Sequence, residues 1–236
     1  MAQKTRKKVF IVIAAFNEEK AIGRVIKGLQ KNKYTNIVVV DDCSADRTAE
    51  VARRAGAIVL RHAANKGQGA ALRTGMKYAL SKGANYIVHF DADGQHRPDE
   101  VKDLLTPLFD GQAEVALGSR FLGKDPTGIP WFRRFALKTS VFILRVFYGL
   151  PVTDAHNGFR AMTARAARKI RITQDRMAHA SEIIELIAKH KLSWIEVPVH
   201  IRYNKYSLRK GTSSIPVWIG ILARMIWKRF SHFFAR

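Results

Sequence analysis

The first half of the chain alternates short, continuous apolar runs with segments in which apolar residues recur every three or four positions. The continuous runs predict buried strands, and they cover residues 9–15, 36–40, 57–60, 86–90 and 115–118. The wider spacing predicts helices, and it covers residues 21–29, 48–55, 66–80 and 98–110. Because strands and helices alternate strictly, we expect an α/β fold with a mainly parallel, doubly wound sheet.

The second half has a different pattern, in which long amphipathic stretches replace the alternation. Residues 131–148 predict a helix with basic residues on one side and aromatic residues over much of the remainder. Residues 194–199 predict a late strand. Residues 215–234 predict a second amphipathic helix, which can lie in a membrane interface with its basic side toward anionic headgroups. The alternative is a core-packing helix with a solvated basic face.

The chain is strongly basic, and the excess is concentrated after residue 118. Lys and Arg total 41 against 19 Asp and Glu, which gives a net charge of +22. Residues 119–236 contain 22 basic and 6 acidic residues, so this half alone carries +16. We expect it to face an anionic partner, which could be a phospholipid surface, a phosphorylated substrate or nucleic acid. Nucleic acid is the least favoured, because the sequence contains no helix-turn-helix, RNA-recognition or zinc pattern.

The sequence also gives expectations about compartment and membrane topology. The single cysteine, Cys43, excludes an internal disulfide and is typical of a reducing compartment. The apolar run at residues 9–16 ends at Asn17 without a small-residue cleavage site, so we expect no signal peptide. No apolar run approaches the roughly 20 residues that a spanning helix needs. We therefore expect peripheral attachment to a membrane.

Acidic side chains directly follow two of the predicted strands. Asp91 and Asp93 end the strand at 86–90, and Asp41 and Asp42 end the strand at 36–40. The carboxyl ends of parallel strands share one edge of an open sheet, where such sheets bind their ligands. Two carboxylates separated by one residue can face one hard divalent cation that carries nucleotide phosphates. The alternative is that Asp91 and Asp93 are solvated turn residues.

Two further loop features have structural explanations beside the functional ones. Ser44 or Asp46 could cap the helix predicted at 48–55. Gly67 and Gly69 open the helix predicted at 66–80, and such a pair is a weak signal for a phosphate-binding loop.

Several motifs stand along the chain in a fixed order. They are Ala14-Ala15-Phe16-Asn17-Glu18-Glu19, Val40-Asp41-Asp42-Cys43-Ser44-Ala45-Asp46, Asn65-Lys66-Gly67-Gln68-Gly69-Ala70-Ala71, Asp91-Ala92-Asp93-Gly94-Gln95-His96, Gly118-Ser119-Arg120, and Asp154 followed by Gly158-Phe159-Arg160. In order and spacing they resemble family 2 glycosyltransferases, in particular the branch of polyprenyl (dolichyl) phosphate mannosyl and glucosyl synthases. The resemblance covers residues 9–213.

The resemblance implies a GT-A type fold that binds a nucleotide sugar at the strand ends. Its nucleotide-binding positions correspond to Ala15, Phe16, Glu18, Asp41, Asp42, Lys66, Asp91 and Ala92. Its metal-binding positions correspond to Asp91, Asp93 and Gln95, and oxygen ligands of this kind suit Mg²⁺ or Mn²⁺. Its phosphate-holding positions correspond to Arg120 and either Arg133 or Arg134, and Arg209 or Lys210 could supply a further phosphate contact. Asp154 matches an acidic residue at the transfer site, so the expected catalytic set is Asp93, Arg120 and Asp154.

The chain departs from the family pattern at identifiable positions. Ala14 stands where proline is usual, Gln68 where lysine is common, and Ser214 where a lysine frequently closes a G-x-S-K pattern. The Q-x-x-R-W signature of processive synthases is absent, which argues against polymer synthesis.

The function that these features predict is metal-dependent transfer of one hexose from a nucleotide-diphosphate sugar to polyprenyl or dolichyl phosphate. GDP-mannose is the favoured donor and UDP-glucose the next. A lipid phosphate is already anionic near neutral pH, so the reaction needs no strong general base. We expect a catalytic domain at 1–213, an interfacial helix at 214–236, and a site of action on the cytoplasmic face of a membrane. A membrane-anchoring partner protein is left open.

Two other functions remain as alternatives. The first keeps the donor site but uses a sugar hydroxyl on a lipid or glycan as acceptor, in which case Asp154 would have to act as the base. The second, more distant, is a nucleic-acid-binding protein, suggested by the sequence pI of about 10.5.

Overall fold

The computed structural model describes residues 7–122, 150–154 and 157–202. The helix predicted at 131–148, the interfacial helix predicted at 214–236 and the predicted phosphate contacts Arg133, Arg134 and Arg209 lie outside the described residues.

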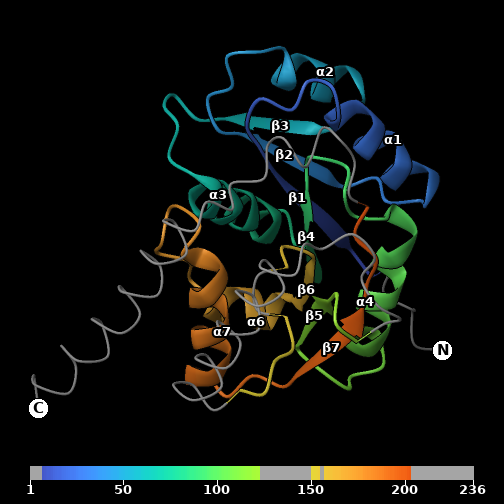
Figure 1. Ribbon diagram of the computed structural model, residues 1–236, viewed down its shortest axis with the longest axis vertical. Coiled ribbons are helices and arrows are strands. Elements are labelled where there is room, and N and C mark those ends of the chain that lie inside the picture. Colours follow the sequence, from blue (N-terminus) through green and yellow to red (C-terminus); the bar gives the residue numbers. More distant parts are fainter. Residues whose placement is uncertain (1–6, 123–149, 155–156, 203–236) are drawn as a thin grey trace, which may run out of the picture.

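The described residues form an α/β structure around one mixed, mostly parallel sheet (Figure 1). In spatial order its seven strands are β3 (Ile58–Arg61), β2 (Ile37–Asp41), β1 (Val9–Ala15), β4 (Tyr86–Asp91), β6 (Arg160–Thr163), β5 (Val115–Ser119) and β7 (Trp194–Pro198). All pairings are parallel except those of β6, which runs antiparallel between β4 and β5. The carboxyl ends of β1, β2, β4 and β5 therefore lie at the same edge.

Helices cover both faces of this sheet (Figure 1). They are α1 (Ile22–Lys31), α2 (Thr48–Arg54), α3 (Gln68–Ser81), the short 3₁₀ helix η1 (Pro98–Glu100), α4 (Val101–Phe109), α6 (Ala164–Lys169) and α7 (His179–Lys189). Apolar residues of α3, α6 and α7 pack into the core on one face. Those of α1, α2 and α4 pack into the core on the other face.

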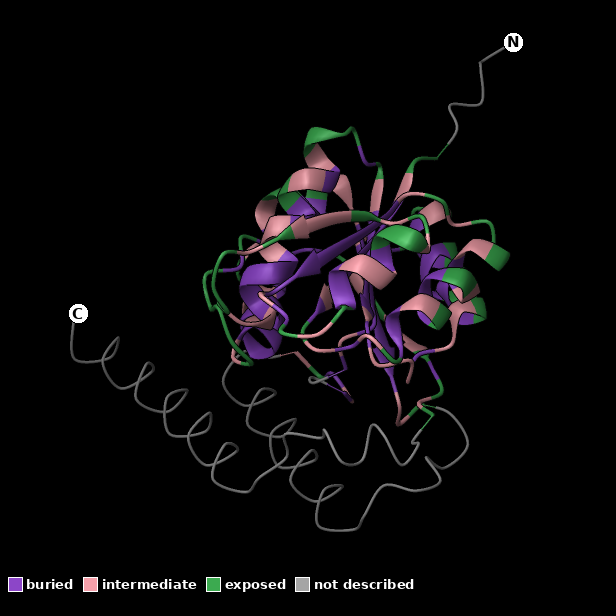
Figure 2. Cartoon of the chain, turned by 90° about the horizontal axis from the view of Figure 1, so that it is seen from above, coloured by how far each residue is buried: buried purple, intermediate pink, exposed green. Residues whose placement is uncertain are grey.

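Strand β1 shows why the sequences of the central strands are continuous apolar runs. Phe10 and Val12 belong to the core on one face of the sheet, whereas Ile11 and Ile13 belong to the core on the other. A strand covered on both faces needs apolar residues at every position. Figure 2 shows the same result as a band of buried residues through the middle of the molecule.

The structure confirms the predicted fold class and all strands and helices predicted before residue 119, with small shifts at their ends. The predicted late strand is β7. The sequence pattern did not predict β6, α6 or α7. None of the helices in the described part of the chain has the length and apolar content that crossing a membrane requires.

Candidate active site at the carboxyl ends of the strands

Asp91, the last residue of β4, is held by two side chains and by the backbone of a glycine. His96 Nε2 lies 2.8 Å from Asp91 Oδ2, and the Gln68 amide donates to Asp91 Oδ1 at 3.3 Å. Gly158 packs directly against the carboxylate, because a Cβ at this position would lie only 2.7 Å from Oδ1. The carboxylate therefore has a fixed orientation, and Gly158 is the residue type that leaves room for it.

Asp93 belongs to the loop between β4 and η1, residues 92–97. Its Oδ1 accepts a hydrogen bond of 2.9 Å from the backbone N–H of Gln95, across a turn in which Gly94 has a φ of +77°. That left-handed conformation favours glycine. Burial, followed by the nearby charge of Asp91, raises the pKa of Asp93 to about 6. The two carboxylates are thus close enough to repel each other.

This pair fits a hard divalent cation. Among the described residues, no group of three or more His, Cys, Asp or Glu side chains could hold a metal ion. Asp91 and Asp93 would therefore supply carboxylate oxygens, and further ligands would come from elsewhere, such as donor phosphates. A cation would also relieve their mutual repulsion. Gln95 contributes its backbone to the loop, and its expected role as a metal ligand stays a prediction.

Burial alone would raise the pKa of Asp91, but the neighbouring His96, His179 and Arg160 more than offset it and hold the pKa below its ordinary value. Asp91 is therefore an anion at neutral pH. Ala92, which follows it, is buried.

Asp42, at the end of β2, organises the loop between β3 and α3. Its Oδ1 accepts from Lys66 N at 2.9 Å and lies 2.7 Å from His62 Nδ1, while its Oδ2 accepts from Gly67 N at 2.6 Å. Gln68, which touches Asp91, directly follows this loop. The structure thus connects the predicted residues Asp42, Lys66 and Asp91. In the structure the Asp42 carboxylate binds residues of the protein itself. Its expected contact with a nucleoside stays a prediction.

The glycine pair near the start of α3 has a packing role. A Cβ at Gly67 would lie 2.5 Å from the carbonyl oxygen of Asp175, and a Cβ at Gly69 would lie 2.0 Å from that of Gln174. In addition, Ala70 N donates to Asp175 O at 3.1 Å. The glycines therefore allow residues 174–175 to cover the start of α3.

The loops that follow β1 and β2 bind each other. Asn17 N donates to Ser44 Oγ at 2.9 Å, and Glu18 N donates to Thr48 Oγ1 at 2.7 Å. Asp46 Oδ1 accepts from Thr48 N at 2.9 Å, at the first residue of α2, but the N-cap position is Arg47 and has no side-chain cap, so neither Ser44 nor Asp46 is the N-cap residue. These contacts set the positions of the predicted nucleotide-binding residues in this region.

Those predicted residues differ in exposure. Ala15 and Glu18 are buried, and Phe16 is 47% exposed. Asp41 is fully buried and forms an ion pair with Arg61, whose Nε lies 3.0 Å from Asp41 Oδ2. Phe16 is the one of these that presents a large side chain at the sheet edge.

Arg120 and Asp154 form a bidentate ion pair beside the end of β5. Arg120 Nε lies 2.6 Å from Asp154 Oδ2, and a terminal guanidinium nitrogen lies 2.7 Å from Oδ1. Asp154 is itself held by Glu196 of β7, whose Oε1 accepts from Asp154 N at 3.1 Å and from Thr153 N at 2.8 Å. The structure therefore brings together two of the three residues of the expected catalytic set.

A buried basic group behind the site was missing from the predicted set. Arg160 is 2% exposed and donates to the carbonyl oxygens of Asn157 and Ala180. Burial lowers its pKa to about 10, so the guanidinium stays charged at neutral pH and acts on both Asp91 and Asp154. His96, which touches Asp91, was also missing. Both residues could have been found from the sequence motifs. His96 is the last residue of the motif that begins at Asp91, and Arg160 is the last residue of the motif that begins at Gly158.

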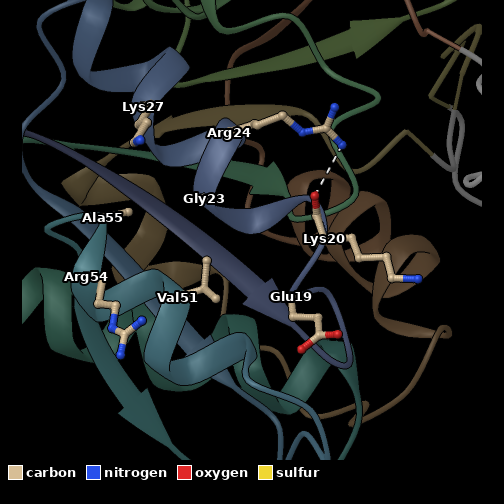
Figure 3. Close-up of a pocket in the computed structure, with 8 residues that line it drawn as sticks. All are labelled: Glu19, Lys20, Gly23, Arg24, Lys27, Val51, Arg54 and Ala55. Atoms are coloured by element: carbon tan, nitrogen blue, oxygen red, sulfur yellow. Dashed lines mark hydrogen bonds between the residues drawn. The ribbon is translucent and has the colours of Figure 1, made fainter.

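A groove of about 450 Å³ lies between α1, α2 and the loop that follows β1 (Figure 3). It is lined by Glu19, Lys20, Gly23, Arg24, Lys27, Val51, Arg54 and Ala55. The carboxylates at the end of β4 do not line it, so it is not the candidate site.

Comparison with known proteins agrees with this geometry. Residues 10–171 match the family model for glycosyl transferase family 2, which is more than half of the chain. The chain belongs to this family. This glycosyl transferase is 44% identical over 211 residues to an uncharacterized protein of Methanocaldococcus jannaschii, covering 88% of this chain and 86% of that protein.

Two relatives of this glycosyl transferase are named for an activity. The UDP-N-acetylglucosamine--dolichyl-phosphate N-acetylglucosaminyltransferase of Methanococcus voltae is 33% identical, covering 88% of this chain and 90% of that protein. The polyprenol monophosphomannose synthase of Mycolicibacterium smegmatis is 30% identical, covering 69% of this chain and 64% of that protein.

Solved structures give the fold of this glycosyl transferase. The glucosyl-3-phosphoglycerate synthase of Mycobacterium tuberculosis, in complex with Mn²⁺, UDP and glucosyl-3-phosphoglycerate, superposes with a TM-score of 0.69 at 18% identity. That match covers 88% of this chain and 75% of the other. A complex of the same enzyme with Mg²⁺ and UDP gives a TM-score of 0.70, covering 93% and 79%. The fold is therefore of the GT-A type.

Proposed function

We propose that this glycosyltransferase transfers a single hexose from a nucleotide-diphosphate sugar to polyprenyl phosphate, with Mg²⁺ or Mn²⁺ as cofactor. The observation that supports this best is the pair of oriented carboxylates, Asp91 and Asp93, in a chain whose relatives are named for dolichyl and polyprenol acceptors. We also propose that residues 1–213 contain the catalytic domain and that residues 214–236, which lie outside the described residues, act at the membrane interface.

The donor lies along the carboxyl ends of β1, β2 and β4 in this proposal. Asp91 and Asp93, with Gln95, would hold the divalent cation, which when bound would supply positive charge against the nucleoside diphosphate leaving group. The exposed ring of Phe16 and the adjoining loops contact the nucleoside. His96 and Gln68 keep the Asp91 carboxylate oriented.

The ion pair of Arg120 and Asp154 favours an acceptor that is already anionic. Both Asp154 oxygens are bound by the Arg120 guanidinium, so this carboxylate is poorly placed to take a proton from a sugar hydroxyl. A lipid phosphate needs no such base. Arg120, with Arg133 or Arg134 and Arg209, binds phosphate groups in the proposed reaction, since guanidinium groups suit bidentate contacts.

The sugar donor is the part of the proposal on which the sequence and the named relatives differ. The sequence alone favours GDP-mannose and then UDP-glucose, whereas the relative that is 33% identical is named for UDP-N-acetylglucosamine. The experiment below therefore compares all three. The basic half of the chain supports peripheral attachment to an anionic membrane on its cytoplasmic face, with or without an anchoring partner protein.

The test is transfer by the purified full chain to polyprenyl phosphate, with each radiolabelled nucleotide sugar in the presence of Mn²⁺ or EDTA. One donor is expected to yield a labelled glycolipid, in the presence of Mn²⁺ only, that mild acid hydrolyses as a sugar phosphate ester. Formation of an acid-stable glycoside on a lipid or glycan hydroxyl would instead support the second acceptor class. No product with any donor, from folded protein, would contradict the proposal.

A further inference from the structure

The chain returns to the candidate metal site after β7. Val199 N donates to Ser119 O at 3.0 Å, at the end of β5, and Arg202 N donates to Gln95 O at 3.0 Å. Between them Ile201 forms an antiparallel bridge with His96. Residues 199–202, which we call the return segment, therefore cross from β5 to the loop that carries Asp93. In Figure 1 this orange-red segment runs beside α4.

Glu100, the last residue of η1, fastens the return segment. Its side chain is buried, and its Oε1 lies 2.6 Å from His200 Nδ1 while its Oε2 accepts from His200 N at 3.1 Å. The His200 side chain is 69% exposed, so packing does little to hold it. The Glu100 carboxylate is the contact that fixes His200.

The contacts of the return segment lead directly to both carboxylates. Gln95, which accepts from Arg202, donates its own N–H to Asp93. His96, which pairs with Ile201, places its Nε2 on Asp91. The His96 ring is also fixed by Phe90 and Phe159, with centroids 5.4 and 4.8 Å away.

We propose that Glu100 is a positioning residue for the metal site, acting through the return segment to hold residues 92–96 in the conformation in which Asp91 and Asp93 face one divalent cation. This inference rests on the proposed function, because it requires that these carboxylates bind the cation. In this proposal Glu100 acts through His200 and is not a ligand of the cation.

Asp99 provides a matched control. It lies on the same turn, and Arg97 pairs with both acids, at 2.6 Å from Asp99 Oδ2 and 3.7 Å from Glu100 Oε1. Glu100→Gln and Asp99→Asn therefore remove the same charge from neighbouring positions. Only the first disturbs the bond to His200. His200→Ala removes the other partner of the Glu100–His200 contact. Because the His200 side chain is exposed, we expect this variant to fold.

The experiment measures Mn²⁺ affinity of the full chain, by the electron paramagnetic resonance of free Mn²⁺, alone and with UDP or GDP. Partners of metal ligands change affinity by about 10- to 100-fold. Glu100 acts through further residues, so we expect Glu100→Gln and His200→Ala to weaken Mn²⁺ binding by about 3- to 10-fold. Asp99→Asn is expected to stay within about twofold of wild type, which is the range for a surface change.

Amide hydrogen exchange gives a readout that a general loss of stability would not produce. In Glu100→Gln the Arg202 amide is expected to exchange faster, while the amides of β1 keep the wild-type rate. Wild-type Mn²⁺ affinity in Glu100→Gln, with binding lost in Asp93→Ala, would overturn the role of Glu100 and leave the metal site standing. If wild type binds no Mn²⁺ in any of these conditions, both the role of Glu100 and the metal site itself are overturned.

Discussion

Gly158→Ala is the substitution that should damage the site most for the smallest chemical change. The added methyl group would lie 2.7 Å from Asp91 Oδ1 and 2.8 Å from Oδ2, where contacts below 3.0 Å essentially never occur. Reaching an ordinary contact of 3.4 Å requires a shift of about 0.7 Å. The carboxylate cannot make this shift freely, because His96 and Gln68 hold it.

The size of the effect follows from this shift. Overpacking of this kind costs about 1 to 3 kcal/mol of folding stability. A displacement approaching 1 Å at a reacting centre costs about 100-fold in rate, so we expect kcat/KM to fall roughly 10- to 100-fold. The protein should remain folded, since the methyl group meets the end of a side chain.

The assay compares kcat/KM, Mn²⁺ affinity and the urea midpoint of Gly158→Ala with those of Gly23→Ala. The control adds the same methyl group on α1, where the neighbouring atom would be Val51 Cγ1 at 3.1 Å and not a carboxylate. Its kcat/KM should match wild type. Wild-type activity and Mn²⁺ affinity in Gly158→Ala would refute the inference that Asp91 must hold its observed orientation.

Three other substitutions test separate parts of the structure. Asp42→Asn replaces one of the two carboxylate oxygens, each of which accepts from a backbone N–H of the β3–α3 loop, with an NH₂ donor. One of these N–H groups then has no acceptor, and urea denaturation should show a loss of about 1 to 3 kcal/mol of stability; an unchanged midpoint would contradict that role. Burial lowers the pKa of His179 from 6.5 to about 4. As the pH drops below 6.5, His179 therefore takes up a proton in the unfolded chain before it does so in the folded protein, and the folding stability falls. Between pH 7 and 5 the free energy of unfolding, measured by urea denaturation, should fall by about 2 kcal/mol more in wild type than in His179→Asn. Equal losses in the two proteins would exclude His179 as the cause. Asp154→Asn breaks a buried ion pair and should cost about 3 to 5 kcal/mol of stability, yet retain measurable transfer to polyprenyl phosphate; complete loss of transfer by folded variant would point to a catalytic base.

Local patterns predicted the elements that bear most of the site. The strands before residue 119 are continuous apolar runs covered on both faces, and the acids at their ends are visible in the sequence. By contrast, β6 has four residues, one of them the buried Arg160, and inserts antiparallel between β4 and β5. A short strand with a buried charge lacks an apolar signature, and its place depends on contacts with distant parts of the chain.

The contacts within the site were less accessible to sequence reasoning. The motif containing Asp91 also contains His96, but nothing local shows that the imidazole reaches back to Asp91. Likewise Glu100 and His200 are separated by 100 positions. The sequence identified the chemical groups, and the fold determined which of them bind one another.

The most direct test of the central claim, that Asp91 and Asp93 form a metal-dependent donor site, is a thermal-shift measurement with GDP-mannose, UDP-glucose and UDP-N-acetylglucosamine. Each donor is tested with Mn²⁺ or EDTA, on wild type and Asp93→Ala. A ligand that binds the folded state raises Tm by mass action. The claim predicts that one donor stabilises wild type with Mn²⁺ only, and that Asp93→Ala loses this shift. An equal shift in EDTA, or in the variant, would contradict it.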